Sequence, residues 1–199
     1  GEILSGIPGR EWIELAKNAG WTFLRVNVVV LVAGLIMVPL GLWLGSQPRR
    51  VKRLSPVIQV IAAFPAPMLF PAFVMLFIQL SIPFSIGSIV LMMAGAQWYL
   101  LFNVMSGISG VPQHLVEYAR TTGMSTAGII RRVYLPAAFP QILTGFITAA
   151  GGAWNTSVVA EIVVLHNQEF VAPGLGSYIA RAANQAMYAE LLAAVIVMV

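Results

Sequence analysis

The chain has 199 residues, of which 59% are hydrophobic and only 9% are charged, and its mean hydropathy is +0.86. A soluble domain carries about a quarter of its residues as charges, so this composition excludes a soluble domain and indicates a membrane protein. Several apolar runs reach the roughly 20 residues that a helix needs to cross the hydrocarbon layer. They are continuous and do not alternate as the strands of a membrane β-barrel do, so the predicted class is all-α and polytopic.

The net charge is +4 and no cysteine is present. Without cysteine the chain forms no disulfide and no thiolate metal site, and no other metal site is predicted. In a membrane protein a net positive charge is explained by the positive residues that fix its orientation in the membrane, so nucleic acid binding is not expected. The chain begins at Gly1 and ends within an apolar run. We therefore expect a single transmembrane domain over residues 1–199 that is part of a longer polypeptide, with its last helix truncated.

An interfacial helix and two membrane spans are predicted first. Residues 1–20 mix apolar and charged positions, which suits a short helix at the membrane surface. The first span covers about residues 22–45 and is followed by four cations within residues 49–53. The second span, about residues 54–80, holds four prolines. Since each proline removes a backbone hydrogen bond, this span is expected to face the bundle interior, where protein or water satisfies the freed carbonyls.

Three more spans follow, so about five transmembrane helices are expected. After a tight turn at residues 81–85, the third span covers about residues 86–107 and the fourth about residues 138–165. Residues 166–185 form a polar connection in which PGLG marks a turn, followed by a possible short helix. The fifth span begins at residue 186 and is too short to cross.

Between the third and fourth spans lies a polar, basic segment at residues 112–136. Pro112 suits the first turn of a helix, Gly123 a left-handed helix end, and Ser125 the cap of a second helix, so two short helices are expected to project from the membrane. Two crossings separate this segment from the cations at residues 49–53, and together they hold seven of the eleven cations. The positive-inside rule makes their side cytoplasmic and places the N-terminus outside. The alternative is that residues 112–136 form an ordinary loop whose charges only fix the orientation of the chain in the membrane.

Residues 117–136, EYARTTGMSTAGIIRRVYLP, resemble the EAA loop of permease subunits of binding-protein-dependent ATP-binding-cassette (ABC) importers. The shared pattern is a Glu, an Ala two residues later, a Gly six residues after the Glu, and then an aliphatic residue, one spacer and Leu-Pro. The middle alanine of the motif is Tyr118 here. LFNVMSG, LPAAFPQILTGF, AWNTSVVAEIV, PGLG and the proline-rich AAFPAPMLFPAF resemble the branch of these permeases that takes up nitrate, sulfonate, taurine or bicarbonate.

This resemblance implies a type I ABC importer permease fold in the bacterial inner membrane, forming the pathway for a small solute. It also implies three protein partners besides the lipid bilayer: ABC ATPase subunits, a second permease subunit or half, and an external (periplasmic) solute-binding protein. Glu117 would pair with a basic residue of the ATPase, and Gly123 would form the turn between the coupling helices. The residues implied to couple the two subunits are Glu117, Ala119, Arg120, Gly123, Met124, Leu135 and Pro136.

The energy source is expected to lie in another chain. No phosphate-binding loop of the G-x-x-x-x-G-K-[ST] form is present, so the permease is not expected to be an enzyme or to bind a cofactor, and ATP and Mg²⁺ belong to the partner ATPase. The second permease half can be a second copy, a different subunit or another half of the same polypeptide.

Polar side chains inside the third and fourth spans are candidates for the translocation pathway or gate, because polar groups in lipid usually face a cavity or a partner helix. A hydrogen bond between helices is an equally open interpretation for each of them. Glu161 is expected near the outer interface, in the outer gate or in a paired contact with a neighbouring chain. Because residues 26–47 and 137–180 hold no Lys or Arg, solute selectivity is expected to rest with the external binding protein. The candidates are Gln97, Asn103, Thr144, Thr148, Asn155, Ser157 and Glu161.

Two other functions stay open at this stage. An ion-coupled secondary transporter would need broken helices paired by internal symmetry and charged sites at the midplane, and the sequence shows neither. A structural membrane anchor for an enzyme complex would have no use for the polar residues in the third and fourth spans.

Overall fold

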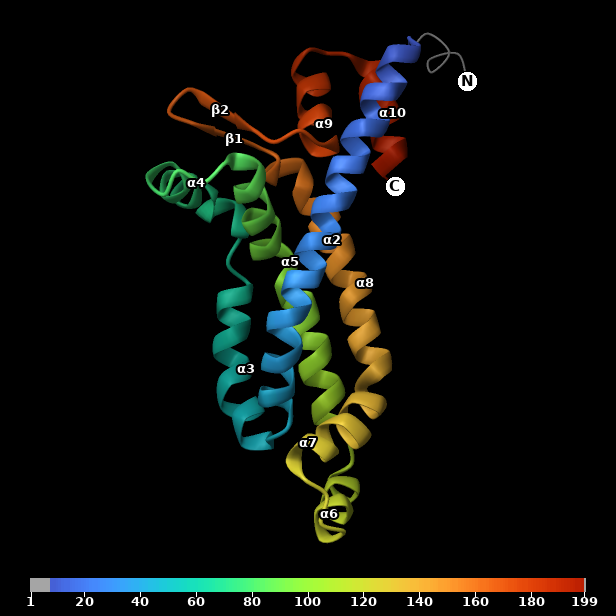
Figure 1. Cartoon of the computed structure of the whole chain (residues 1–199). Helices are drawn as coiled ribbons and strands as arrows, with labels where there is room; N and C mark the ends of the chain where they lie inside the picture. Colours follow the sequence, from blue (N-terminus) through green and yellow to red (C-terminus); the bar gives the residue numbers. More distant parts are fainter. Residues whose placement is uncertain (1–7, 199) are drawn as a thin grey trace. The chain divides into compact units, whose positions relative to one another are not determined.

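The computed structural model describes residues 8–198, which form a helical chain with one short hairpin (Figure 1). Within these residues three helical stretches are long and apolar enough to cross a membrane, and a broken pair of helices makes a fourth. The predicted all-α, polytopic class is confirmed. In chain order the elements are α2 (Gly9–Gly45), α3 (Pro48–Ala62), the 3-10 helix η1 (Ala66–Leu69), α4 (Phe70–Gln79), α5 (Phe84–Ser109), α6 (Gln113–Thr121), α7 (Thr126–Ile129), the π-helix η2 (Ile130–Tyr134), α8 (Leu135–Ala160), β1 (Ile162–Leu165), β2 (Gln168–Val171), α9 (Leu175–Asn184) and α10 (Tyr188–Met198).

The first helix is longer than predicted. Residues 9–20 are helical, but they continue without a break into the first span instead of forming a separate helix. Gly20 is the weakest helix former in this stretch, and one interior glycine costs only roughly 1 kcal/mol relative to alanine. That is too little to end a helix that continues into a long apolar span. Residues 1–7 of the predicted interfacial helix lie outside the described residues, and its position at the membrane surface stays a prediction.

The second span is broken, whereas a single proline-bent helix over residues 54–80 was predicted. Helix α3 ends at Ala62, and η1 with α4 resumes the path after residues 63–65. Pro65 and Pro67 lack a backbone N–H, and proline also disfavours a helical conformation in the residue before it. Two such residues in close succession stop the helix. At the other end α3 begins with Pro48 in its first turn, so the four cations of residues 49–53 belong to this helix and not to a loop.

The fourth span ends earlier than predicted, because α8 stops at Ala160 and Ile162–Leu165 form strand β1. This strand pairs antiparallel with β2, from Ile162 opposite Val171 to Leu165 opposite Gln168. His166 and Asn167 between the strands both have positive φ, at 49° and 64°, as a two-residue hairpin turn requires. Short apolar runs suit a strand or a helix equally by hydropathy, so the hairpin was missed. The short helix after PGLG is confirmed as α9.

The chain divides into two compact units, each described by itself. The hairpin unit consists of residues 8–29, 65–95 and 152–198, and the loop unit consists of residues 30–64 and 96–151. Helices α2, α5 and α8 contribute to both. In the hairpin unit, α9 and α10 pack together around Leu175, Tyr178 and Ala194, and Leu15 of α2 joins this cluster.

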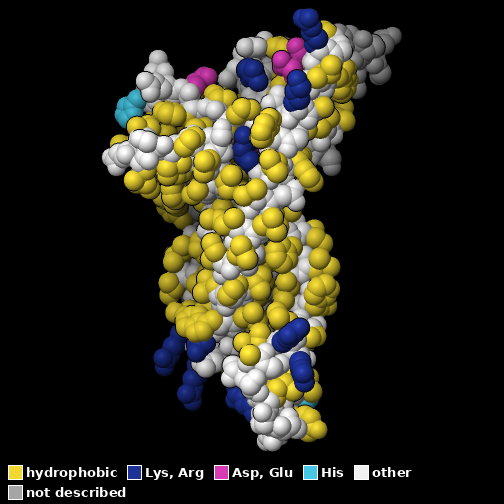
Figure 2. Space-filling view, in the orientation of Figure 1, with side chains coloured by type: hydrophobic (Ala, Val, Ile, Leu, Met, Phe, Trp, Pro, Cys, Tyr) yellow, Lys and Arg dark blue, Asp and Glu magenta, His cyan; other side chains and the backbone are white. Residues whose placement is uncertain are grey.

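The loop unit packs the three long helices closely. A Cβ on Gly41 of α2 would lie 2.6 Å from Val104 of α5, and a Cβ on Gly145 of α8 would lie 2.9 Å from Leu100. Glycine at these positions lets membrane helices approach each other. The outer surface is apolar: Leu35 and Val60 are 78% and 75% exposed. Figure 2 shows this apolar surface and, at the end of the loop unit where α3 begins and α6 lies, a gathering of Lys and Arg side chains.

Candidate functional site

The segment at residues 112–136, which we call the coupling loop, begins with helix α6. Pro112 is the residue before α6 and not its first turn as predicted, since its ψ of 128° is extended. Val116 and Ala119 are each 4% exposed and form the buried face of the helix. Leu115, one turn before Ala119 on this helix, is 44% exposed.

The turn after α6 is fixed by backbone hydrogen bonds. Gly123 has a φ of +78°, the left-handed conformation that was predicted. Its N–H donates to the carbonyl of Arg120, and the N–H of Met124 donates to the carbonyl of Ala119, both at 3.0 Å. These two bonds make a complete Schellman motif. The turn therefore has a defined conformation that depends on glycine.

The second helix of the coupling loop is capped as predicted and then merges with α8. The Ser125 hydroxyl accepts a hydrogen bond from the Gly128 N–H at 3.2 Å. After α7 the backbone widens into the π-helix, where the Leu135 N–H donates to the carbonyl of Ile130. A second separate helix was expected, but α7, η2 and α8 form one continuous stretch from Thr126 to Ala160. The wide turn directly before Pro136 accommodates a residue that cannot donate a helical hydrogen bond.

The predicted coupling residues fall into three groups. Ala119, Met124 and Pro136 line one surface pocket between α6 and the start of α8. Arg120 lines a different pocket on the other side of α6. Glu117 and Gly123 are exposed, and Leu135 is half-buried. Within residues 8–198 the Glu117 carboxylate has no ion-pair partner, so it is available to another chain.

The loop unit has a strongly one-sided charge. It holds seven of the eleven cations of the chain but one of its seven acidic residues, Glu117. Four of the cations lie on α3 and three on the coupling loop. An acidic group on this basic surface is distinctive, and it is placed on the exposed side of α6 next to Tyr118, which is 71% exposed.

Three of the four pathway candidates of the loop unit satisfy their polar groups within their own helices. Thr144 donates to the carbonyl of Pro140 and Thr148 to that of Thr144, at 2.9 and 2.8 Å. Asn103 donates to the carbonyl of Tyr99 at 2.8 Å. Such bonds let a polar side chain remain in an apolar medium. Thr144 and Thr148 are exposed and one turn apart on α8, while Gln97 and Asn103 are half-buried.

The candidates of the hairpin unit differ in exposure. Asn155 is exposed, whereas Ser157 and Glu161 are fully buried. Ser157 donates to the carbonyl of Trp154 at 2.7 Å. Because no solute reaches Ser157 or Glu161 in this conformation, a place for either on the pathway stays a prediction.

Glu161 is the centre of a buried network that sequence reasoning missed. Arg25 Nη1 donates to Glu161 Oε1 at 2.6 Å, and the Thr22 hydroxyl donates to the same oxygen at 2.7 Å. The Gly176 N–H donates to Oε2 at 2.8 Å, so the carboxylate also lies at the N-terminus of α9, where the helix dipole favours negative charge. The second guanidinium nitrogen of Arg25 donates to the carbonyl of Pro173 at 2.8 Å. The charge partner of Glu161 thus comes from the same chain.

This buried network explains why the PGLG sequence at residues 173–176 has glycine at two positions. A Cβ on Gly174 would collide with the Glu161 carboxylate, and a Cβ on Gly176 would collide with the backbone of Ser157. Both glycines are required for close approach. The sequence held a signal for the network: Arg25 is the one charged residue of the predicted first span and Glu161 that of the fourth, and buried charges usually occur in opposite pairs.

Comparison with known proteins gives a family and a fold. The family described as "Binding-protein-dependent transport system inner membrane component" matches residues 37–199. A putative ABC transporter permease protein of Methanocaldococcus jannaschii is 31% identical over 157 residues, 77% of this chain and 56% of that protein. The bicarbonate transport system permease protein CmpB of Synechocystis is 26% identical over 185 residues, 91% of this chain and 63% of that protein. The chain therefore spans about three fifths of the length of these relatives.

The fold has a close counterpart among solved structures. A chain of the MetNI methionine ABC transporter, in an inward-facing conformation, superposes with a TM-score of 0.73 at 19% identity, over 96% of this chain and 93% of that one. This match confirms the predicted type I importer permease fold.

Proposed function

The chain belongs to the family of binding-protein-dependent transport system inner membrane components, and we propose that it is the transmembrane permease subunit of an ATP-driven importer. In this role its helices form part of the pathway for a small solute, and the coupling loop docks on a separate ATPase subunit. Of the relatives, CmpB is named for bicarbonate. With the sequence resemblance described above, this supports a small anion of the nitrate, sulfonate, taurine or bicarbonate type as the solute.

The observation that carries the proposal is the shape of the coupling loop. The Schellman turn at Gly123 and the cap at Ser125 hold α6 and α7 in fixed conformations, and the outer side of α6 presents Glu117 and Tyr118. A rigid projection transmits a displacement to the helices that follow it, because packed elements move as bodies. Since η2 joins α7 directly to α8, a push on the loop would move a membrane helix.

The orientation follows from the one-sided charge of the loop unit. Positive residues near membrane helices are retained in the cytoplasm, so we place the coupling loop on the cytoplasmic face of a bacterial inner membrane. An external solute-binding protein then delivers the solute, and a second permease half completes the pathway. Residues 26–47 and 137–180 hold no Lys or Arg, and Arg25 is already paired with Glu161, so these segments offer no cation for an anion. This supports selectivity by the binding protein.

The absence of cysteine from the chain makes the docking test direct. A cysteine placed at Tyr118 is expected to form a cross-link with the ATPase and to be shielded from a membrane-impermeant maleimide in intact cells. A cysteine at Glu169 in the hairpin, one predicted crossing away, is the matched control and is expected to react with the maleimide and form no such cross-link. Cross-linking from Glu169 in place of Tyr118 would refute the docking, and labelling of Tyr118→Cys from outside would refute the orientation.

A further inference from the structure

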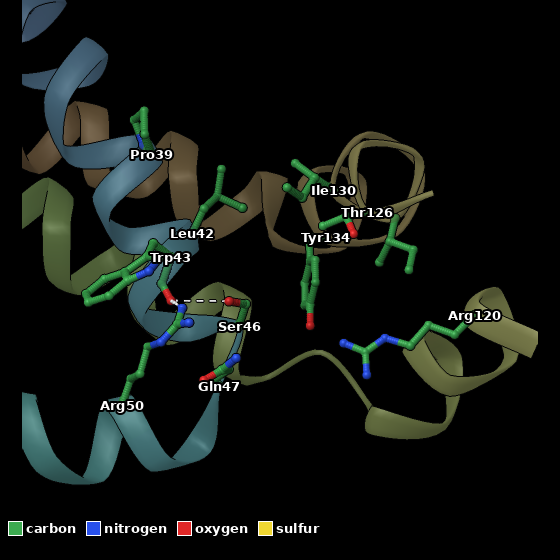
Figure 3. Close-up of a pocket in the computed structure, with 11 residues that line it drawn as sticks. Pro39, Leu42, Trp43, Ser46, Gln47, Arg50, Arg120, Thr126, Ile130 and Tyr134 are labelled. Atoms are coloured by element: carbon green, nitrogen blue, oxygen red, sulfur yellow. Dashed lines mark hydrogen bonds between the residues drawn. The ribbon is translucent and has the colours of Figure 1, made fainter. Parts of the chain in front are cut away.

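The end of the loop unit contains a pocket of about 420 Å³ that none of the roles above uses, although Arg120 is one of its lining residues. Its walls come from the last turns of α2, the first turn of α3, α6, and the stretch from α7 to η2 (Figure 3). It therefore lies where the coupling loop meets the membrane helices.

Hydrogen-bond donors lie at two ends of the pocket, Arg50 at one and Arg120 with Tyr134 at the other (Figure 3). Arg50 Nη1 donates to the carbonyl of Trp43 at 2.7 Å, and its guanidinium carbon lies 4.4 Å from the centroid of the Trp43 ring. A guanidinium has five N–H donors, so Arg50 keeps donors for a ligand. In Figure 3 the Arg120 guanidinium points into the pocket toward the Tyr134 hydroxyl. Neither group has a hydrogen-bond partner within residues 8–198, and no acidic side chain lines the pocket.

Much of the remaining lining is apolar. It is formed by Leu42, Ile129 and Ile130 together with Pro39. Trp43, which is 50% exposed, adds an aromatic edge of the kind found at the level of lipid headgroups. Two cations, a free phenol and an adjoining apolar wall suit an amphiphile with an anionic head.

We propose that this pocket binds an anionic glycerophospholipid of the cytoplasmic leaflet, with the phosphate against Arg120 and the Tyr134 hydroxyl and with Arg50 adding positive charge at the other end of the pocket. An acyl chain lies along Leu42 and Ile130. Basic pockets between membrane helices on the cytoplasmic side bind anionic headgroups, and guanidinium groups hold phosphate with paired hydrogen bonds. The assignment to the cytoplasmic leaflet depends on the orientation proposed above for the importer, whereas the chemistry of the ligand is inferred from the pocket alone.

A lipid in this position would connect the α2–α3 turn to the π-helix. It would therefore steady the part of the coupling loop that continues into α8. An acidic segment of a soluble partner could use the same cations, but it would leave the apolar wall without a matching surface. The lipid fits both the polar and the apolar parts of the pocket.

The test is lipid retention by the purified transporter, measured by native mass spectrometry after exchange into detergent with equal amounts of palmitoyl-oleoyl phosphatidylglycerol and phosphatidylcholine. The unaltered chain is expected to retain phosphatidylglycerol about tenfold over phosphatidylcholine, and Arg120→Gln is expected to lower that retention by about tenfold. Tyr134→Phe, which removes only the hydroxyl, lowers it severalfold. Arg53→Gln removes the same charge from an exposed position of α3 outside the pocket and is expected to leave retention unchanged.

Four results would overturn the proposal. The first is equal retention of the two lipids, and the second is an equal loss in Arg53→Gln and Arg120→Gln, which would indicate a diffuse charge effect. The third is release of the phosphatidylglycerol by excess inorganic phosphate, which would identify a free-anion site. The fourth is an Arg120→Gln variant that releases the ATPase but keeps the lipid, which would identify the pocket as a binding site for a protein partner. Retention does not require transport, so failure of the importer proposal would leave this assay unaffected.

Discussion

Removing either partner of the Arg25–Glu161 pair is expected to destabilise the fold more than removing both. The Arg25 side chain is 7% exposed and the Glu161 side chain 0%. Glu161→Leu leaves a buried guanidinium without its counter-charge, and Arg25→Met leaves a buried carboxylate. Breaking one side of such a pair costs about 3–5 kcal/mol, whereas replacing both partners by apolar residues is often close to neutral.

The double variant is not expected to be fully neutral, since Glu161 also accepts from the Gly176 N–H and the Thr22 hydroxyl. Leaving buried donors unmatched costs about 1–3 kcal/mol, so Arg25→Met with Glu161→Leu should fall between the unaltered chain and either single variant. At about 2–4 °C per kcal/mol for a chain of this size, the single variants should lower the Tm by about 6–20 °C.

The assay is thermal unfolding of the purified permease in a fixed detergent. Lys17→Met is the matched control, because Lys17 is an exposed cation of the same helix, and it should change stability by less than about 0.5 kcal/mol. Additive losses in the double variant would show that the two charges do not stabilise each other and would refute the reasoning.

The remaining predictions concern three single positions. Gly176→Ala should lower the Tm by several degrees, because the new methyl group meets the Ser157 backbone and such overpacking costs about 1–3 kcal/mol; Gly20→Ala, which has open space, should not lower it. Burial, and then the hydrogen bond to Glu11, raise the pKa of Tyr178 to about 12. The fold thus favours the neutral phenol, so stability should fall as the pH rises from about 10 to 12, and a decline of equal size in Tyr178→Phe would contradict this. Ser125→Ala removes the cap of α7, which is worth about 1 kcal/mol, and should speed amide exchange at Gly128; unchanged exchange there would contradict the cap's role.

The sequence predicted the long membrane helices and the turn and cap of residues 112–136 well, because both depend on local patterns. Long apolar runs located α2, α5 and α8, and Gly123 and Ser125 are residues whose turn and cap chemistry is local. The boundaries were less accurate where two structures suit the same residues. The hydropathy of Ile162–Leu165 also suits the end of a membrane helix, and these residues form a strand because they pair with Gln168–Val171.

Contacts between distant segments could not be derived from local patterns. The network at Glu161 joins residues separated by 136 positions in the sequence, and PGLG gave only a turn signal until the close approach of Glu161 and Ser157 explained its glycines. Likewise, Arg50 and Arg120 were recognised as topology signals. Their shared pocket becomes visible only when α3 and α6 are brought to the same end of the loop unit.

The most direct test of the central claim is ATP hydrolysis by the reconstituted importer carrying Gly123→Val. The new side chain meets no atom within 4 Å, but the left-handed conformation costs a branched residue about 1–2 kcal/mol, so the perturbation is confined to the turn of the coupling loop. Gly20→Val, at an open position of α2, is the control.

We predict that Gly123→Val assembles with the ATPase and hydrolyses ATP at the basal rate, yet loses both stimulation by the loaded binding protein and solute uptake. Glu117→Lys should do the same by reversing the exposed acidic charge of α6. Stimulated hydrolysis and uptake at the unaltered rate in Gly123→Val would contradict the claim that this loop transmits the work of the ATPase to the membrane helices.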